Sequence, residues 1–151
     1  GFMHTSDRTL LNIRGKALFL GDYSIGRGCR IDIAENATLE VGHTGYVNAN
    51  TRFIIHHHLK IGQDCAISWD CQFLDDDFHS ISYEGKKEKE EGIEIGNHVW
   101  IGNYVKIYKG TRIPDGCVIA ADSSVRGIFT EKNCLIAGNP ARVVKEGVRW
   151  E

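Results

Sequence analysis

The stretch of sequence that decides the fold is IGNHVWIGNYVKIYKGTRIPDGCVIAADSSV, residues 95–125. An aliphatic residue returns in it at every sixth position, and a small or β-branched residue follows four positions after each. The aliphatic positions are Ile95, Ile101, Ile107, Ile113, Ile119 and Val125, and the small ones are Val99, Val105, Thr111, Cys117 and Ser123. A period of six fits neither a helix of 3.6 residues per turn nor a strand that alternates at every second residue. It predicts a coil with three flat faces, in which each hexapeptide supplies one strand and one corner.

The same period continues toward the N-terminus with slips in phase. Its runs are Phe19, Ile25 and Ile31, then Val41, Val47 and Phe53, then Ile61, Ile67 and Phe73. The slips predict a short insertion within residues 54–58 and a longer loop over residues 80–92. We expect an all-β parallel β-helix with coils over residues 17–136, in a single domain over residues 1–151. A β-sandwich with chance spacing is the alternative, and the consecutive matches at the aliphatic position argue against it.

The composition of the 151 residues agrees with a coil that is rich in corners. It includes 17 glycines but only 2 prolines, and the formal net charge is −2, which gives no reason to expect nucleic acid as a partner. No stretch approaches the ~20 apolar residues of a membrane span, and residues 1–10 lack the build of a signal peptide. We therefore expect a cytoplasmic protein. The five cysteines form no C-x-x-C pair and are expected to be reduced, four of them as small spacers in the repeat: Cys29, Cys65, Cys71 and Cys117.

Three further blocks of sequence carry a family resemblance. They are Asp77-Phe78-His79, IGNHVWIG at residues 95–102 and AGNPARV at residues 137–143. With these blocks the chain resembles, over roughly residues 17–147, a left-handed parallel β-helix acyltransferase of the hexapeptide-repeat family. The galactoside, maltose and polysaccharide O-acetyltransferase branch is the most similar. The resemblance implies the left-handed coil, acetyl-CoA as acyl donor, and a homotrimer with active sites between neighbouring subunits, whereas general rules favour right-handed parallel crossovers.

His79 is the candidate general base. Acyl transfer from a thioester to a hydroxyl needs a base of near-neutral pKa and a donor for the developing oxyanion. His79 lies where the repeat is interrupted, at the mouth of the largest insertion. The carboxylate of Asp75, Asp76 or Asp77 could hold one imidazole nitrogen, and the residues alone do not choose among them. Asp77 would share the face of His79 in an extended segment.

The resemblance also implies positions for the donor and the acceptor. Trp100 would wall the site, and Asn103 would donate to the oxyanion unless it is a plain turn asparagine. The remaining expected coenzyme contacts are Ala120, Ala121, Arg126, Arg142 and Lys145, and the expected acceptor contacts are Asn48, Asn50 and Asp76. The three cations could equally be solvated surface charges. Asp122 replaces a glycine of the family pattern, and aspartate tolerates the left-handed backbone that this turn needs.

The other histidines do not indicate a metal site. His56, His57 and His58 fall at the short insertion, where consecutive side chains point to opposite sides and cannot easily bind one ion. The γ-class carbonic anhydrases share the fold, but their histidine pair five residues apart has no counterpart here. We expect no metal. His43 and His98 fall at turns and are expected to be solvated.

The inserted loop and the C-terminal end of the repeat are the last features that the sequence predicts. Residues 83–92 alternate in charge between glycines and predict an exposed loop, which in the family reaches toward the adjacent subunit. Pro140 ends the repeat, and residues 139–151 are expected to form a C-terminal cap with a short helix over residues 141–146. Some cap is required, because an open end of a β-helix invites pairing with other chains.

The residues and the resemblance together predict an acetyl-CoA-dependent O-acetyltransferase that acts on a sugar or glycan hydroxyl by direct transfer. An N-acetyltransferase for an amino sugar or amino acid is the nearer alternative, since the same acyl group can pass to an amine. A non-catalytic β-helix scaffold is the other. The expected lack of a helical N-terminal extension shifts the preference from free disaccharides to a polysaccharide or glycolipid precursor.

Overall fold

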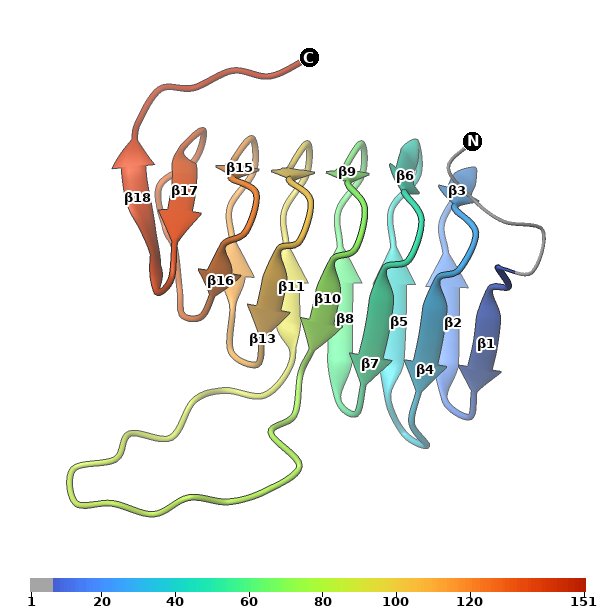
Figure 1. The fold of residues 1–151 in the computed structure, drawn as a ribbon, viewed down its shortest axis with the longest axis horizontal. Coiled ribbons are helices and arrows are strands. Elements are labelled where there is room, and N and C mark those ends of the chain that lie inside the picture. Colours follow the sequence, from blue (N-terminus) through green and yellow to red (C-terminus); the bar gives the residue numbers. More distant parts are fainter. Residues whose placement is uncertain (1–6) are drawn as a thin grey trace.

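The computed structural model describes residues 7–151, in which three sheets form a stacked coil (Figure 1). The first sheet contains β1 (Leu10–Ile13), β4 (Arg30–Ile33), β7 (Arg52–Ile55), β10 (Gln72–Leu74), β13 (Lys106–Tyr108) and β16 (Ser124–Val125). The second contains β2 (Lys16–Phe19), β5 (Thr38–Val41), β8 (His58–Ile61), β11 (Ile93–Ile95) and β14 (Arg112–Ile113). The third contains β3 (Tyr23–Ile25), β6 (Gly45–Val47), β9 (Ala66–Ile67), β12 (Trp100–Ile101), β15 (Val118–Ile119), β17 (Leu135–Gly138) and β18 (Ala141–Lys145).

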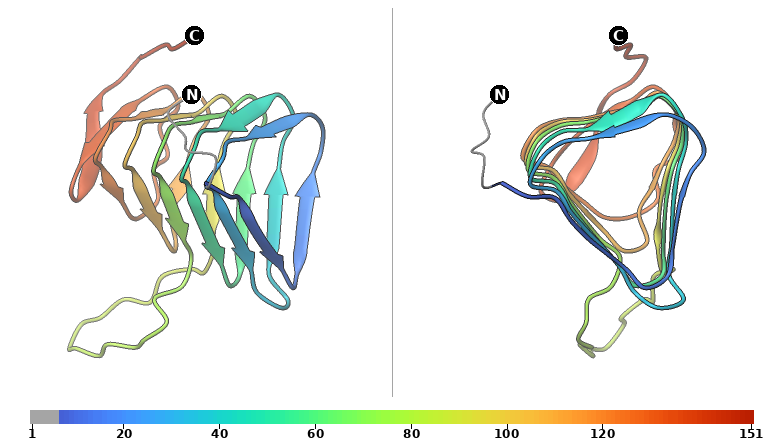
Figure 2. Two further views of the ribbon diagram at one scale, coloured as in Figure 1. Left: turned by 45° about the vertical axis from the view of Figure 1, so that its right-hand side comes forward. Right: turned by 90° about the vertical axis from the view of Figure 1, so that its right-hand side faces the viewer.

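Viewed along its axis, the coil is a triangular prism (Figure 2). We name its three corners after what they carry. The loop corner joins the first sheet to the second and includes residues 56–57, 75–92 and 109–111. The His98 corner joins the second sheet to the third and includes residues 42–44, 62–65 and 96–99. The Asn103 corner joins the third sheet back to the first and includes residues 48–51, 68–71, 102–105 and 120–123.

The core confirms the period of six. Ile101 pairs in register with Ile67 of the coil before it and Ile119 of the coil after it, and each of these three side chains is fully buried. Phe53 and Phe73 stack with ring centroids 4.9 Å apart. Stacking of equivalent aliphatic residues therefore forms one continuous column of core along the axis.

The corners confirm the role of the small residues. Val99, Val105 and Cys117 are fully buried, and all the cysteines are buried and free. Burial raises the pKa of Cys65 and Cys71 to about 11, so these thiols pack as inert spacers. Asp122 has a φ of 64°, which confirms that aspartate carries the left-handed turn expected of it.

The two ends of the coil differ from expectation. At the N-terminal end, β1 pairs in register with β4, so coiling begins before residue 17, and residues 1–6 of the expected domain lie outside the described residues. At the C-terminal end, the expected helix over residues 141–146 is wrong, because β18 pairs antiparallel with β17. The physical reason is that β17 offers an unpaired edge, and the β-branched Val143 and Val144 favour a strand on it.

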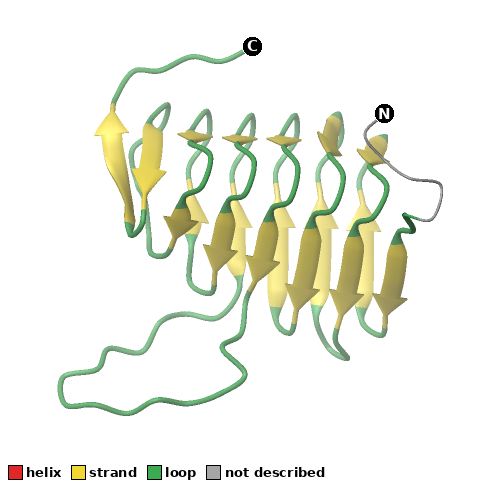
Figure 3. Cartoon of the chain, in the orientation of Figure 1, coloured by secondary structure: helices red, strands yellow, loops and turns green. Residues whose placement is uncertain are grey.

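The chain leaves the coil after β10 and rejoins it at β11, as the long loop below the prism in Figure 1. This confirms the inserted loop and places its base at the loop corner. Residues 7–151 contain no helix (Figure 3), and so no helix of this part of the chain is long and apolar enough to span a membrane.

Candidate active site

Asp75 anchors the loop corner and is fully buried. Its Oδ1 accepts a hydrogen bond from the backbone N–H of His56 at 2.7 Å, and its Oδ2 accepts from those of His57 and His58 at 2.9 and 2.8 Å. A buried carboxylate is costly unless such donors compensate it. The carboxylate of Asp75 therefore serves the backbone of the neighbouring coil and is engaged away from His79.

Asp76 turns the chain toward the loop. Its Oδ1 accepts the N–H of Phe78 at 2.7 Å, and its Oδ2 lies 2.9 Å from Nε2 of His57. The N–H of Phe78, followed by the imidazole of His57, holds the pKa of Asp76 below its ordinary value. Both carboxylate oxygens of Asp76 therefore have partners at the base of the loop.

Phe78 separates Asp77 from His79. It adopts a φ of 61°, a left-handed conformation that is unfavourable for a bulky residue. Its ring packs edge-on against the His56 imidazole, with ring centroids 4.6 Å apart. The extended segment that would place Asp77 and His79 on one face is therefore absent. Asp77 pairs with Nζ of Lys109 at 3.3 Å. Within residues 7–151, no hydrogen bond or ion pair joins the exposed His79 to any of the three aspartates.

A cavity of about 220 Å³ lies between the loop and the edge of the first sheet. Five cationic side chains and two acidic ones line it: Lys86, Lys87, Lys89, Lys109, Arg126, Asp77 and Glu88. The guanidinium of Arg126 lies 3.9 Å from the centre of the Tyr108 ring. Arg126 is thus held at the loop, and the cavity is cationic although the whole chain has a net charge of −2.

The Asn103 corner carries most of the other predicted residues. Asn103 is exposed, and its carbonyl accepts the N–H of Asp122 at 3.0 Å. The corner's predicted residues are Asn48, Asn50, Asn103, Ala120 and Ala121. The first sheet separates this corner from the loop corner, so a single chain does not bring these residues to His79.

Trp100 lies on the outer side of the third sheet, as expected, and is 42% exposed. Its Nε1 lies 3.4 Å from Oγ of Ser68, which belongs to the Asn103 corner. Arg142 and Lys145 lie on β18, where both are exposed. The three cations expected at the coenzyme phosphates are therefore divided between β18 and the loop corner.

His98 lies at a turn and its side chain is 42% exposed, as expected, but it also has protein partners that the sequence did not predict. Its ring stacks on Trp150 with centroids 3.9 Å apart, and Nδ1 lies 2.6 Å from Oδ2 of Asp64. Its Nε2 lies 3.0 Å from the carbonyl oxygen of Trp150. In return, Nε1 of Trp150 donates a hydrogen bond to the carbonyl of His98 at 2.9 Å. The C-terminal segment thus folds back onto the His98 corner. Among residues 7–151, no group of three or more His, Cys, Asp or Glu side chains is arranged to hold a metal ion.

Comparison with known proteins identifies the family. The model of the bacterial transferase hexapeptide family (six repeats) matches residues 92–127. A polysialic acid O-acetyltransferase of Neisseria meningitidis is 33% identical over 147 residues, covering 92% of this chain and 68% of that protein. The chain belongs to the hexapeptide-repeat acetyltransferases.

Further relatives and solved structures are similar to the chain. An uncharacterized 24.8 kDa protein in the cps region of Klebsiella pneumoniae is 44% identical over 141 residues, 93% of this chain, although the chain spans only 63% of that protein. A maltose O-acetyltransferase from Clostridium difficile 630 superimposes with a TM-score of 0.73 at 27% identity, covering 89% of this chain and 72% of that one. A galactoside acetyltransferase in complex with coenzyme A superimposes with a TM-score of 0.69 at 27% identity, covering 87% of this chain and 64% of that one. The fold is the left-handed parallel β-helix that the resemblance implied.

Sequence reasoning missed how the chain pairs its triple histidine with Asp75 and Asp76. Asp75 follows His56 by 19 residues, which is close to one coil of the repeat, so the two triplets face each other at the loop corner. That spacing was the available signal. Sequence reasoning also missed Tyr108 and Lys109 as site residues. They line the cavity because they lie at the end of β13 beside the departing loop.

The His98 contacts predict a pH-dependent stability. The carbonyl of Trp150, and then Asp64, raise the pKa of His98 above the ordinary value of 6.5. The stabilisation is therefore complete below that value and is lost as the pH rises through the higher pKa of the folded protein. We expect His98→Gln to lower the thermal midpoint by about 1–3 °C at pH 5.5, and by less at pH 9. A difference in thermal midpoint between wild-type and His98→Gln protein that stays constant from pH 5.5 to pH 9 would contradict the prediction.

Proposed function

We propose that this chain transfers an acetyl group from acetyl-CoA to a hydroxyl of a sugar or glycan, with His79 as general base. The observation that carries the proposal is the placement of His79. It stands exposed at the start of the loop, and neither of its ring nitrogens has a hydrogen-bond partner within residues 7–151. Asp75 and Asp76 anchor the loop base before it, which supports a fixed position for the imidazole of His79.

The reaction balances without a covalent enzyme intermediate. An imidazole nitrogen of His79 takes the hydroxyl proton while the acceptor oxygen bonds to the thioester carbonyl carbon. The amide of Asn103 and nearby backbone N–H groups donate to the oxyanion of the tetrahedral intermediate. The intermediate collapses, the carbon–sulfur bond breaks, and the thiolate of coenzyme A takes the proton from the imidazolium.

This assignment needs a second subunit. His79 lies at the loop corner and Asn103 at the Asn103 corner, with the first sheet between them. We propose that the loop corner of one subunit faces the Asn103 corner of its neighbour in a homotrimer. Coenzyme A then follows the small residues Ala120 and Ala121, with Trp100 beside it and the cations of β18 near its phosphates. A galactoside acetyltransferase of the same fold, solved with coenzyme A, supports this donor.

The cationic cavity supports an acceptor that carries a negative charge. Arg126, Lys87 and Lys89 line it and have no carboxylate partner within residues 7–151. Cations of this kind recognise carboxylates and phosphates. The Neisseria relative is named for an acidic polysaccharide, which agrees with this assignment. We therefore assign Arg126 to the acceptor and no longer to the coenzyme.

The assignment of Arg126 predicts a selective effect. We expect Arg126→Gln to raise KM for an acidic oligosaccharide about tenfold, and to leave KM for its neutral ester and for acetyl-CoA unchanged. Lys132→Gln is the matched control, since Lys132 is an exposed cation paired with Asp115 elsewhere on the surface. An increase confined to acetyl-CoA would return Arg126 to the coenzyme phosphates.

Paired acceptors test the reaction itself. We expect acetylation of sugar hydroxyls, detected as an alkali-labile ester, to exceed acetylation of matched amino sugars. Predominant formation of stable amides would favour the N-acetyltransferase alternative. Failure to bind coenzyme A at millimolar concentration would favour the non-catalytic scaffold.

A further inference from the structure

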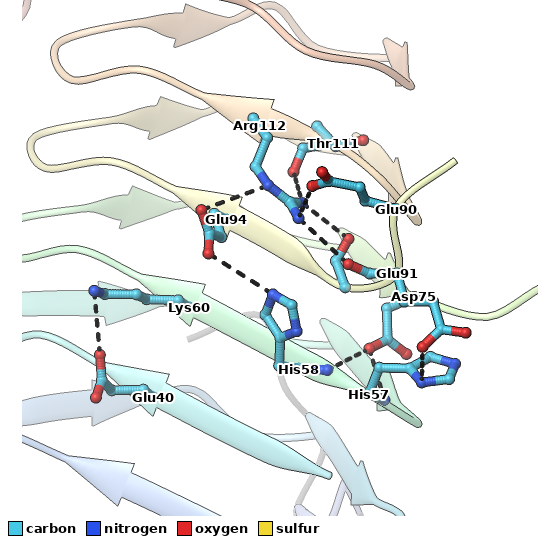
Figure 4. Close-up of polar contacts among 11 residues, drawn as sticks. Glu40, His57, His58, Lys60, Asp75, Glu90, Glu91, Glu94, Thr111 and Arg112 are labelled. Carbon is cyan, nitrogen blue, oxygen red and sulfur yellow. Dashed lines mark hydrogen bonds and ion pairs between the residues drawn. The ribbon is translucent and has the colours of Figure 1, made fainter. Parts of the chain in front are cut away.

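His57 closes the base of the long loop. Its Nε2 lies 2.9 Å from Oδ2 of Asp76, where the chain departs from the coil, and its Nδ1 lies 2.9 Å from Oε2 of Glu91, where the chain returns. The backbone N–H of His57 is held independently by Asp75. Figure 4 shows His57 and Asp75 side by side at this corner, with Glu91 on the returning chain above them. One imidazole therefore joins the two ends of the loop.

Each ring nitrogen of His57 faces a carboxylate. A neutral imidazole has one N–H and one lone pair, whereas the imidazolium donates from both nitrogens. With a carboxylate at hydrogen-bond distance from each nitrogen, only the imidazolium makes both contacts favourable. Loss of its proton leaves a lone pair facing a carboxylate, and one of the two ends is released.

The other charges at this corner hold only one end each. Arg112 binds the returning chain, donating to the carbonyls of Glu91 and Gly92 at 3.3 and 3.2 Å and pairing with Glu90 at 3.3 Å (Figure 4). It also pairs with Glu94 at 3.5 Å, and Glu94 lies 3.8 Å from His58. On the departing side, His56 packs against Phe78, and Asp77 pairs with Lys109. Within residues 7–151, only His57 bridges the departing and returning ends.

The bridge reaches the proposed base through one residue. Asp76, which His57 holds, accepts the N–H of Phe78, and His79 follows directly. We propose that His57 is a positioning residue for the acetyl transfer proposed above, and that its imidazolium clasps the loop and sets the place of His79.

The two variants of His57 test the clasp in catalysis. His57→Gln removes the charge, and we expect kcat/KM to drop about tenfold. His57→Arg keeps a permanent cation, and we expect nearly wild-type kcat/KM. A drop of the same size in both variants would overturn the proposal.

Hydrogen exchange tests the clasp apart from catalysis. We expect the amides of residues 77–90 to exchange at least several-fold faster in His57→Gln and in Glu91→Gln than in wild-type protein, and His57→Arg to restore protection. His43→Gln is the control, because His43 is an exposed imidazole at the His98 corner whose one side-chain hydrogen bond within residues 7–151 is to Thr44. Unchanged exchange in both test variants would overturn the clasp. If wild-type protein transfers no acetyl group, the proposed function fails, while faster exchange in the variants still supports the clasp.

Discussion

We expect His79→Ala to lower kcat for acetyl transfer by about 10²–10⁴-fold, the range that general-base catalysis contributes. The side chain is exposed, so its removal leaves no cavity in the core. Affinity for coenzyme A should stay unchanged, because the expected coenzyme contacts lie on the Asn103 corner and β18. The measurements are steady-state kinetics with a sugar acceptor, titration with coenzyme A, and sizing of the oligomer.

His43→Ala provides the matched control for this prediction. His43 is another exposed imidazole, at a different corner of the prism, and its loss should leave kcat unchanged. Residual turnover of more than a tenth in His79→Ala would contradict the general-base role. A sizing measurement that gives a monomer would contradict the shared active site, since one chain carries His79 and Asn103 on separate corners.

Asp75→Asn should have the largest effect on stability. The asparagine keeps the shape of the side chain but has one acceptor oxygen, and its NH₂ group would face a backbone N–H of the histidine triplet. Leaving buried donors unsatisfied costs about 1–3 kcal/mol each, so we expect a loss of about 2–4 kcal/mol. For a domain of this size, that corresponds to a thermal midpoint lower by roughly 5–15 °C. Thermal and urea unfolding measure it.

Asp77→Asn is the neighbouring control. Asp77 is exposed and makes a surface ion pair with Lys109, and such pairs contribute about 0–1 kcal/mol. If Asp77→Asn and Asp75→Asn destabilised the protein equally, the anchoring role of Asp75 would be wrong. Asp75→Asn should also loosen the loop, so its acetyl transfer should fall more than that of the control.

The coil could be predicted because the period of six reports burial directly. A residue such as Ile101 meets its equivalents in adjacent coils whatever the loops do, and the structure buries it between Ile67 and Ile119. His79 could be singled out because the repeat breaks there. The partner of His79 could not be predicted, because the choice depends on Phe78, whose left-handed backbone turns Asp77 away. The N–H of Phe78 donates to Asp76 in a local Asx turn, and the residues alone do not choose this turn over an extended segment.

Contacts between distant segments explain the remaining differences. The segment after Pro140 could form a helix or a strand, and the free edge of β17 selected the strand. His98 is a turn residue, as predicted, but only the tertiary structure shows that the C-terminal segment brings Trp150 onto its ring. The sequence placed the triple histidine at a corner but did not show its partners: Asp75 and Asp76 of the next coil accept hydrogen bonds from its backbone and contact the ring of His57.

The repeating pattern of the chain was sufficient for the all-β coil, its small corner residues, the inserted loop and the exposed histidine, because each depends on burial at one position of a repeat. The tertiary structure alone decided which aspartate is the anchor, where the cations gather and that His57 joins both ends of the loop. These features depend on which side chains the stacking of coils brings within hydrogen-bond distance, because a charged group forms hydrogen bonds or ion pairs with the groups that lie next to it.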